Sequence, residues 1–259
     1  AMFDSAARVD APCVYDETRT LLVDGIRSWV QNREQGVIRC ILGHSGVGKS
    51  TLAQTIAREC RRQDWLVATF FFSRSDPDMN HTKKVVSTLA YQLAHQDKIY
   101  KASIEEIFQR SPSILEKSID VQWSKLIVDI IRQSPPTPSV IILDGLDECE
   151  NKEEQLHLLQ LLALQVSPLA KFIITFRPTL HIQKLLQRLD LNAECLIYLG
   201  DSQEDRHDIQ QFLRSSFREI SRAKALTSGN GDWPSDDAQE KLVNMASGQF
   251  RFAAAVIKF

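Results

Sequence analysis

The chain has 259 residues, with 31 Lys and Arg against 33 Asp and Glu, so its formal net charge is −2. A hydrophobic fraction of 43% and a charged fraction of 25% are ordinary for a globular protein and exclude a disordered chain. A net charge near zero argues against a nucleic-acid binder held mainly by phosphate neutralisation, although a local basic patch stays open.

The cysteines and apolar stretches indicate a cytoplasmic protein without a membrane span. The 5 cysteines are widely spaced and include no CxxC pair, so reduced thiols are expected. The apolar stretches at 156–166 and 250–257 fall short of the ~20 residues that a membrane helix needs. No secretory leader is expected, because Asp4, Arg8 and Asp10 interrupt the opening segment.

Short apolar runs alternate with amphipathic helical patterns over the first 200 residues, which predicts a parallel sheet covered by helices. Strands are expected over 37–42, 66–72, 140–143, 171–175 and 195–199. Helices are expected over 17–32, with Leu21 on its apolar side, and over 49–63, 82–95, 99–110, 121–133, 152–166 and 180–189. From residue 201 the pattern is wholly helical. We therefore expect an α/β domain over 1–200 and part of a helical domain over 201–259.

A glycine-rich segment between the first strand and its helix matches the pattern GxxxxGK[ST]. Its glycines allow the backbone amides to surround an anion, and the following helix N-terminus adds a favourable dipole. Lys49 is expected to reach the β- and γ-phosphates of a nucleotide, and Ser50 to ligate Mg²⁺. The predicted phosphate-binding residues are Gly43, His44, Ser45, Gly46, Val47, Gly48, Lys49, Ser50 and Thr51.

An apolar strand ends in acidic residues at the edge of the sheet where ligands bind. Asp144 directly follows Leu143, and it is expected to hold Mg²⁺ directly or through water. Asp147 and Glu148 follow three and four residues later. Either could position the attacking water or complete the magnesium shell, and the alternative is that they cap the next helix.

Arg177 ends the next strand at the same edge of the sheet. An arginine there can stabilise the terminal phosphate. The alternatives are a solvated side chain and an ion-pair partner for Asp147. The predicted catalytic residues are thus Lys49, Asp147, Glu148 and Arg177.

These motifs, in this order, resemble the NACHT family of STAND-class signal-transduction NTPases. The resemblance rests on Gly43–Thr51, Ile141–Glu148 and Phe172–Pro178, and the spacing of acids in the middle motif is the most diagnostic. Segments 4–7, 13–19, 70–74 and 246–250 are similar to fungal NLR-like proteins. Two positions depart from the family: Phe176 replaces a usual Ser, and Arg251 replaces a usual apolar residue. A buried charge at Arg251 would be costly, so its segment is either exposed or packed differently.

The resemblance implies a P-loop NTPase three-layer sandwich, with a five-stranded parallel sheet in the order 5-1-4-3-2, followed by part of a helical domain. It implies a switch that binds ATP or ADP with Mg²⁺, hydrolyses ATP slowly and self-associates in the full-length protein. Family members carry an effector domain before this region and sensor repeats after it, and act in immunity or incompatibility. Thr18 and Arg19 are candidates to approach the nucleotide, against a helix-capping Thr with a surface Arg.

Other functions share this core. One alternative is a small-molecule or nucleotide kinase, but no Arg-rich lid insertion stands between the third and fifth strands. A second is a scaffold that holds nucleotide without turnover. No guanine-reading motif stands in the expected place, which favours ATP over GTP without a residue that proves it.

Overall fold

The computed structural model describes residues 2–4, 14–15, 18–133, 138–164, 170–189, 191, 193–223 and 233–259. All adjacent strands of its sheet pair in parallel, in the order β2-β3-β4-β1-β5. The order is the expected 5-1-4-3-2 counted from the other edge, so the predicted fold class is confirmed. The strands are β1 (Ile38–Gly43), β2 (Leu66–Phe71), β3 (Ser139–Asp144), β4 (Ala170–Phe176) and β5 (Leu196–Leu199).

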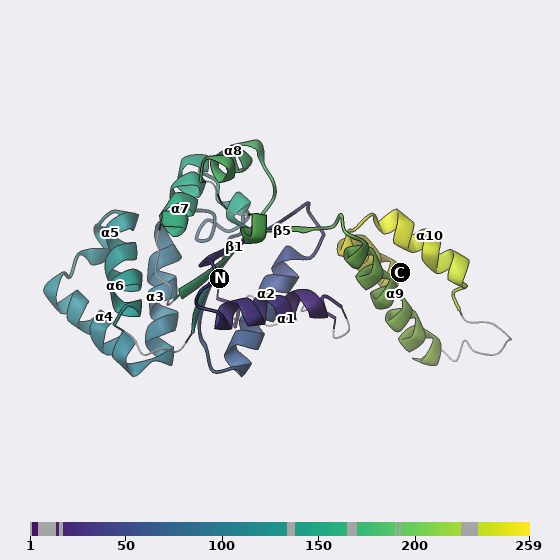
Figure 1. Ribbon diagram of the computed structural model, residues 1–259, viewed down its shortest axis with the longest axis horizontal. Helices are drawn as coiled ribbons and strands as arrows, with labels where there is room; N and C mark the ends of the chain where they lie inside the picture. Colours follow the sequence, from purple (N-terminus) through teal and green to yellow (C-terminus); the bar gives the residue numbers. More distant parts are fainter. Residues whose placement is uncertain are drawn as a thin grey trace.

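Helices cover both faces of the sheet and form the outer two layers (Figure 1). Successive strand residues point to opposite faces, so Ile141 and Leu143 pack into one core while Val140 and Ile142 pack into the other. The second core lies under α1 (Thr20–Gln31) and α2 (Lys49–Arg62). The first core lies under α3 (Val85–Gln96), α4 (Lys98–Arg110), α5 (Ile119–Trp123), α6 (Asp129–Ile131), α7 (Lys152–Leu164) and α8 (Leu180–Arg188).

The described elements follow the predicted ones closely, with two differences. The helix expected over 121–133 begins at Ile119 and contains a π-helical turn at Ser124–Val128. Leu21, expected on the apolar side of the first helix, is 74% exposed. Residues 5–8, 10, 13, 16–17 and 165–166, on which some of the predictions rest, lie outside the described residues. Within the described ranges, no helix combines the length and apolarity needed to cross a membrane.

Three helices follow β5 and pack on one another: α9 (Gln203–Ala223), α10 (Asp236–Ala246) and α11 (Phe250–Lys258). We call them the C-terminal helices. Their shared core includes Ile209, Leu213 and Ala253. Figure 1 shows α9 and α10 beyond the end of the sheet, reached through β5.

Backbone contacts fix the C-terminal helices against the loop that joins β1 to α2. Gly200 follows β5, and Gly248 lies in the turn between α10 and α11. A Cβ on Gly248 would lie 1.9 Å from the carbonyl oxygen of Gly200, so only glycine permits this approach. A Cβ on Gly200 would lie 2.8 Å from Cγ1 of Val47 in the loop. The link from β5 to α9 and the turn between α10 and α11 therefore meet close to the glycine-rich loop.

Candidate nucleotide-binding site

The predicted phosphate-binding loop lies between β1 and α2, as the motif requires. Gly46 and Gly48 adopt φ of 86° and 92°, a region that L side chains rarely enter. Helix α2 begins directly after Gly48, so the amides of its first turn have no partner within the helix. The loop and this helix N-terminus together form a backbone concavity suited to an anion.

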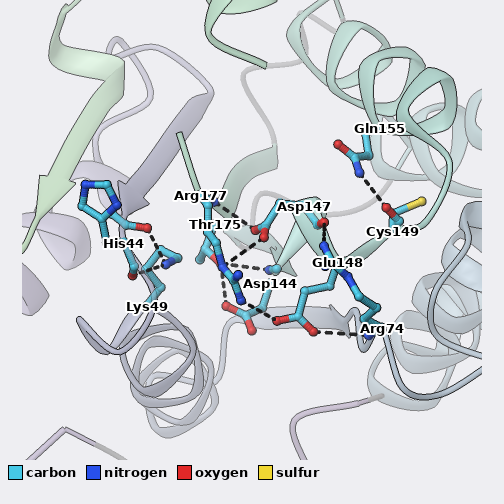
Figure 2. A network of polar contacts seen from close by, with 12 residues as sticks. His44, Lys49, Arg74, Asp144, Asp147, Glu148, Cys149, Gln155, Thr175 and Arg177 are labelled. Atoms are coloured by element: carbon cyan, nitrogen blue, oxygen red, sulfur yellow. Dashed lines mark hydrogen bonds and ion pairs between the residues drawn. The ribbon is translucent and has the colours of Figure 1, made fainter. Parts of the chain in front are cut away.

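Lys49 lies at the mouth of the loop and is only 9% exposed. Its Nζ donates hydrogen bonds to the carbonyl oxygens of Gly43 (2.6 Å) and His44 (2.9 Å) (Figure 2). Burial lowers the pKa of Lys49, and the nearby carboxylates of Asp147 and Asp144 oppose that shift. The ammonium is thus largely removed from water and held by the loop itself, next to both acids.

Asp144 ends β3 and is 3% exposed. Its Oδ1 accepts a hydrogen bond of 2.6 Å from Oγ1 of Thr175, on the neighbouring strand β4. Thr175 also accepts a bond of 2.9 Å from the amide of Gly145. The motif Phe172–Pro178 assigns no role to Thr175, whose hydroxyl fixes the carboxylate of Asp144 and the turn that follows it. Thr175 lines a cavity beside the phosphate-binding loop, whose lining does not include Asp144.

Asp147 and Arg177 form a two-point contact. The amide of Arg177 donates to Oδ1 of Asp147 (2.9 Å), and Nε lies 3.3 Å from Oδ2. Nη2 of Arg177 also lies 3.8 Å from Oε1 of Glu148, and Figure 2 marks this contact. The contact with Asp147 that was expected as one alternative is present, and Arg177 also lines the cavity with a 43% exposed side chain.

The helix-capping alternative for Asp147 and Glu148 is wrong for the helix that follows them. The side chain of Asn151 accepts hydrogen bonds from the amides of Glu153 and Glu154 at the start of α7. Asp147 and Glu148 instead belong to a 3-10 turn, Leu146–Glu148, and both line the cavity.

Arg74 is a second residue that sequence analysis did not assign to the site. It comes from the segment between β2 and α3, and its amide donates to Oε2 of Glu148 over 3.3 Å. Its guanidinium donates to the carbonyl oxygen of Asp147 over 3.1 Å. Arg74 therefore holds the acidic turn from the side opposite Arg177. The only sequence signal was its place in the family-like segment 70–74.

A cavity of about 450 Å³ connects these groups. Its polar lining includes the two acids of the turn and Arg177. Six of the nine predicted loop residues also line it: Ser45, Gly46, Gly48, Lys49, Ser50 and Thr51. Gly43 and His44 accept the hydrogen bonds of Lys49 through their carbonyl oxygens. The Val47 side chain packs in the second core.

Aromatic side chains also line the cavity. Tyr15, Phe212 and Phe250 line it, with ring centroids 5.7 Å apart for the first pair and 6.2 Å for the second. The volume lies within the range usual for small-molecule sites. A cavity lined by both an anion-binding loop and aromatic rings fits a ligand that joins phosphates to a planar ring.

Arg19 is buried, 5% exposed, at the edge of this cavity. It donates to the carbonyl oxygen of Val47 over 2.7 Å, and its guanidinium carbon lies 5.1 Å from the centre of the Phe250 ring. The hydroxyl of Thr18 donates to Tyr15 rather than capping α1. The alternative of a capping Thr and a surface Arg is therefore wrong.

The donor set beside the loop fits Mg²⁺ chemically. Ser50 lines the cavity, and the carboxylate of Asp144 lies close enough to Lys49 to affect its pKa. Oxygen ligands from one or two side chains, completed by phosphates and water, are what Mg²⁺ usually takes. Among the described residues, no group of three or more His, Cys, Asp or Glu side chains is placed to hold a metal ion.

The parallel sheet order and the strand–loop–helix motif define the chain as a P-loop NTPase by fold. The chain belongs to the family described as "Nephrocystin 3, N-terminal", whose sequence pattern matches residues 18–177, more than half of the chain. No curated protein matches the sequence.

Solved structures support the fold assignment. The Walker-type ATPase PABY2304 of Pyrococcus abyssi is similar over 95% of this chain and 73% of its own length, with a TM-score of 0.51 and 15% identity. PCH-2 of C. elegans (TM-score 0.51, 14% identity) is similar over 93% of this chain and 62% of its own. The structure of Drosophila ORC bound to DNA (TM-score 0.51, 14% identity) is similar over 92% of this chain and 54% of its own length. At such identities the likeness concerns the fold alone.

Proposed function

We propose that the chain binds ATP with Mg²⁺ in this cavity and hydrolyses it slowly. The observation that carries the proposal is the single cavity in which the phosphate-binding loop and Lys49 meet the acidic turn and Arg177. Phosphates would lie on the loop, and the base would lie among Tyr15, Phe212 and Phe250. No residue of the cavity decides between ATP and GTP, so a preference for ATP is itself part of the proposal.

Ser50 and Asp144 would hold Mg²⁺, which, when bound, neutralises charge on the phosphate oxygens. Thr175 supports that assignment, because its hydroxyl fixes one oxygen of Asp144 through a hydrogen bond. Lys49 would exchange its loop carbonyl partners for phosphate oxygens.

Glu148 is the better candidate to orient the attacking water. Its side chain is 35% exposed and lines the cavity, whereas the 5% exposed side chain of Asp147 is bound at both oxygens by Arg177. Asp147 would therefore position Arg177, and Arg177 would stabilise charge on the terminal phosphate.

We further propose a NACHT-type switch of an NLR-like receptor, cytoplasmic and self-associating in the full-length protein. The motifs Gly43–Thr51, Ile141–Glu148 and Phe172–Pro178, in this order, support it. In this proposal residues 1–200 form the nucleotide-binding domain and 201–259 begin the helical domain. The separate core of the C-terminal helices supports that division. Effector and sensor regions would lie outside this chain.

The test is phosphate release from ATP and Mg²⁺ over time by the chain and three variants. We expect several turnovers per chain, lost in Lys49→Ala because the phosphate contact is gone, and strongly reduced in Glu148→Gln. Glu150→Gln, an exposed acid two residues away, is the matched control and should keep the wild-type rate. Nucleotide binding without release would favour the scaffold alternative, and equal rates in all four proteins would contradict the assigned roles.

A further inference from the structure

Another cavity, of about 330 Å³, is lined by residues of α9 and α10 and shares no lining residue with the nucleotide cavity. Arg214, Arg218 and Arg222 line it from α9, and their spacing of four residues puts them on one face of the helix. Among the described residues of its lining, Asp236 is the one carboxylate. The row of arginines extends along about 12 Å of helix, which suits an extended ligand better than a single small anion.

Two of these arginines have no counter-charge among the described residues. Nη2 of Arg214 lies 3.8 Å from Oδ1 of Asp236. Within the described part of the chain, Arg218 and Arg222 take part in no ion pair, and both are exposed. Each guanidinium therefore keeps its fork of donors available to a carboxylate from another molecule.

One buried polar atom of the cavity lining also lacks a partner. Gln239 lines the cavity from α10 and is only 8% exposed. Its Nε2 donates to the carbonyl oxygen of Pro234 over 2.8 Å, which settles which atom of the amide is the oxygen. That oxygen, Oε1, is buried and accepts no hydrogen bond from any residue that the structure describes. Because buried acceptors are nearly always paired in folded proteins, a ligand that carries N–H groups would complete this one.

Apolar surface lies beside the arginines. Trp233 is 47% exposed, and its ring stands edge-on to Phe217 with ring centroids 5.6 Å apart. Both rings line the cavity. A ligand that uses the whole cavity therefore combines negative charges with an apolar group.

We propose that Arg218 and Arg222 bind two carboxylates of an extended acidic segment of a partner protein. Side chains two residues apart in an extended chain lie about 6–7 Å apart on the same side. Residues four apart on a helix have Cβ atoms about 6 Å apart, so acidic residues at alternate positions would each meet one arginine. An apolar residue of the segment would pack against Trp233, and a backbone N–H would donate to Gln239. This site does not depend on nucleotide binding.

Charge favours a peptide over a nucleic acid as the occupant. A nucleic-acid backbone carries a negative charge at every phosphate, so it would place charges next to Asp236 as well as next to the arginines. A formal net charge of −2 also gives the chain no broad positive field to attract such a backbone. A peptide can place a neutral residue beside Asp236.

The experiment titrates the chain into a short fluorescein-labelled peptide in which Glu alternates with Leu, and follows fluorescence anisotropy. One comparison peptide carries Gln in place of Glu, and another has the same composition with its Glu residues gathered in one block. We expect the alternating Glu peptide to bind, the Gln peptide to bind at least about tenfold more weakly, and the block peptide to lie between.

Variants of the chain assign the binding to the two arginines. Arg218→Gln combined with Arg222→Gln should weaken the alternating peptide about tenfold, because both charge-assisted contacts are lost. Arg218→Lys combined with Arg222→Lys keeps the charge without the planar fork and should lie between. Lys241→Gln combined with Lys258→Gln removes the same charge from exposed residues outside the cavity lining, and should match wild type.

Failure of the alternating peptide to bind, or equal binding of the Glu and Gln peptides, would overturn this inference. An equal loss in the arginine and control variants would also overturn it, because net charge alone would then explain the binding. Tighter binding of a single-stranded DNA oligonucleotide than of the peptide would overturn the peptide as occupant. Melting temperatures check folding. If the Gln variant does not fold, the Lys variant decides, since loss of the fork should weaken the alternating peptide selectively.

Discussion

Arg19 and Asp205 form a buried ion pair, with Nη2 of the arginine 3.1 Å from Oδ1 of the carboxylate. The pair joins the residue before α1 to the first turn of α9, 186 positions along the chain. The same Nη2 donates to Val47 in the phosphate-binding loop, and the backbone amide of Arg19 donates to Asp208 over 3.0 Å. Arg19 adopts φ of 54°, which a non-glycine residue keeps only when its surroundings fix it.

Replacing Arg19 should therefore be costly. Arg19→Ala leaves the carboxylate of Asp205 buried without its charge partner, and we expect a loss of about 3–5 kcal/mol in the free energy of unfolding. Urea unfolding of the chain at neutral pH measures this loss. Arg206→Ala, which removes the half-exposed pair with Glu240, is the control and should cost about 1 kcal/mol or less. Similar losses in both variants would show that the buried pair is not a major contact.

The hydroxyl of Thr175 should contribute both to the stability of the fold and to the Mg²⁺ dependence of nucleotide binding. Thr175→Val keeps the shape of the side chain but leaves the carboxylate of Asp144 and the amide of Gly145 without their common partner. We expect a loss of about 1–3 kcal/mol in the free energy of unfolding, together with weaker dependence of nucleotide binding on Mg²⁺. Thr175→Ser retains the hydroxyl and should keep most of both properties. Identical behaviour of the two variants would contradict the role given to this hydroxyl.

Two buried thiols should make stability fall at alkaline pH. Burial is the main cause that raises the pKa of both Cys40 and Cys60 to about 12, with smaller contributions from Cys195 and Glu59 respectively. An unfolded chain releases these protons from about pH 8.5 upward, while the folded chain keeps them. The folded state then binds more protons, so the free energy of unfolding falls as pH rises from about 9 towards 12.

The slope tests this account. Each thiol should contribute about 1.4 kcal/mol per pH unit in that window. Cys60→Ala should remove its share of the slope, although it also lowers stability at pH 7 through lost packing. Urea unfolding of both proteins at pH 7, 9 and 10 gives the comparison. Parallel pH profiles for wild type and Cys60→Ala would contradict a protonated, buried thiol.

Much of the fold could be predicted from the sequence because the strands carry a strong local signal. The run from Val140 to Leu143 is apolar on both faces, as a strand covered on both sides requires. The order of the strands could not be predicted in this way, because the hydrophobic pattern indicates only that a sheet is parallel. That order came from the family resemblance and is confirmed by the pairing of β1 with both β4 and β5.

The parts of the site that were missed depend on contacts between distant segments. The loop and the acids follow a local motif, whereas Thr175 acts on Asp144 across two strands and Arg74 reaches the acidic turn from another loop. The aromatic lining of the cavity brings Tyr15 next to Phe212. No local spacing encodes such pairs, so only the folded chain reveals them. The exposed Leu21 shows the same limit, since periodicity cannot tell which edge of an apolar stripe is covered.

The central claim is that the loop beginning at Gly43 and the acidic turn form one nucleotide site. The most direct measurement is calorimetric titration of ATP, with Mg²⁺, into the chain and into Lys49→Ala. Our account predicts one site per chain in the wild type and affinity reduced at least a hundredfold in the variant, because the buried ammonium that would contact the phosphates is gone. No binding by the wild type, or equal binding by both proteins, would contradict it.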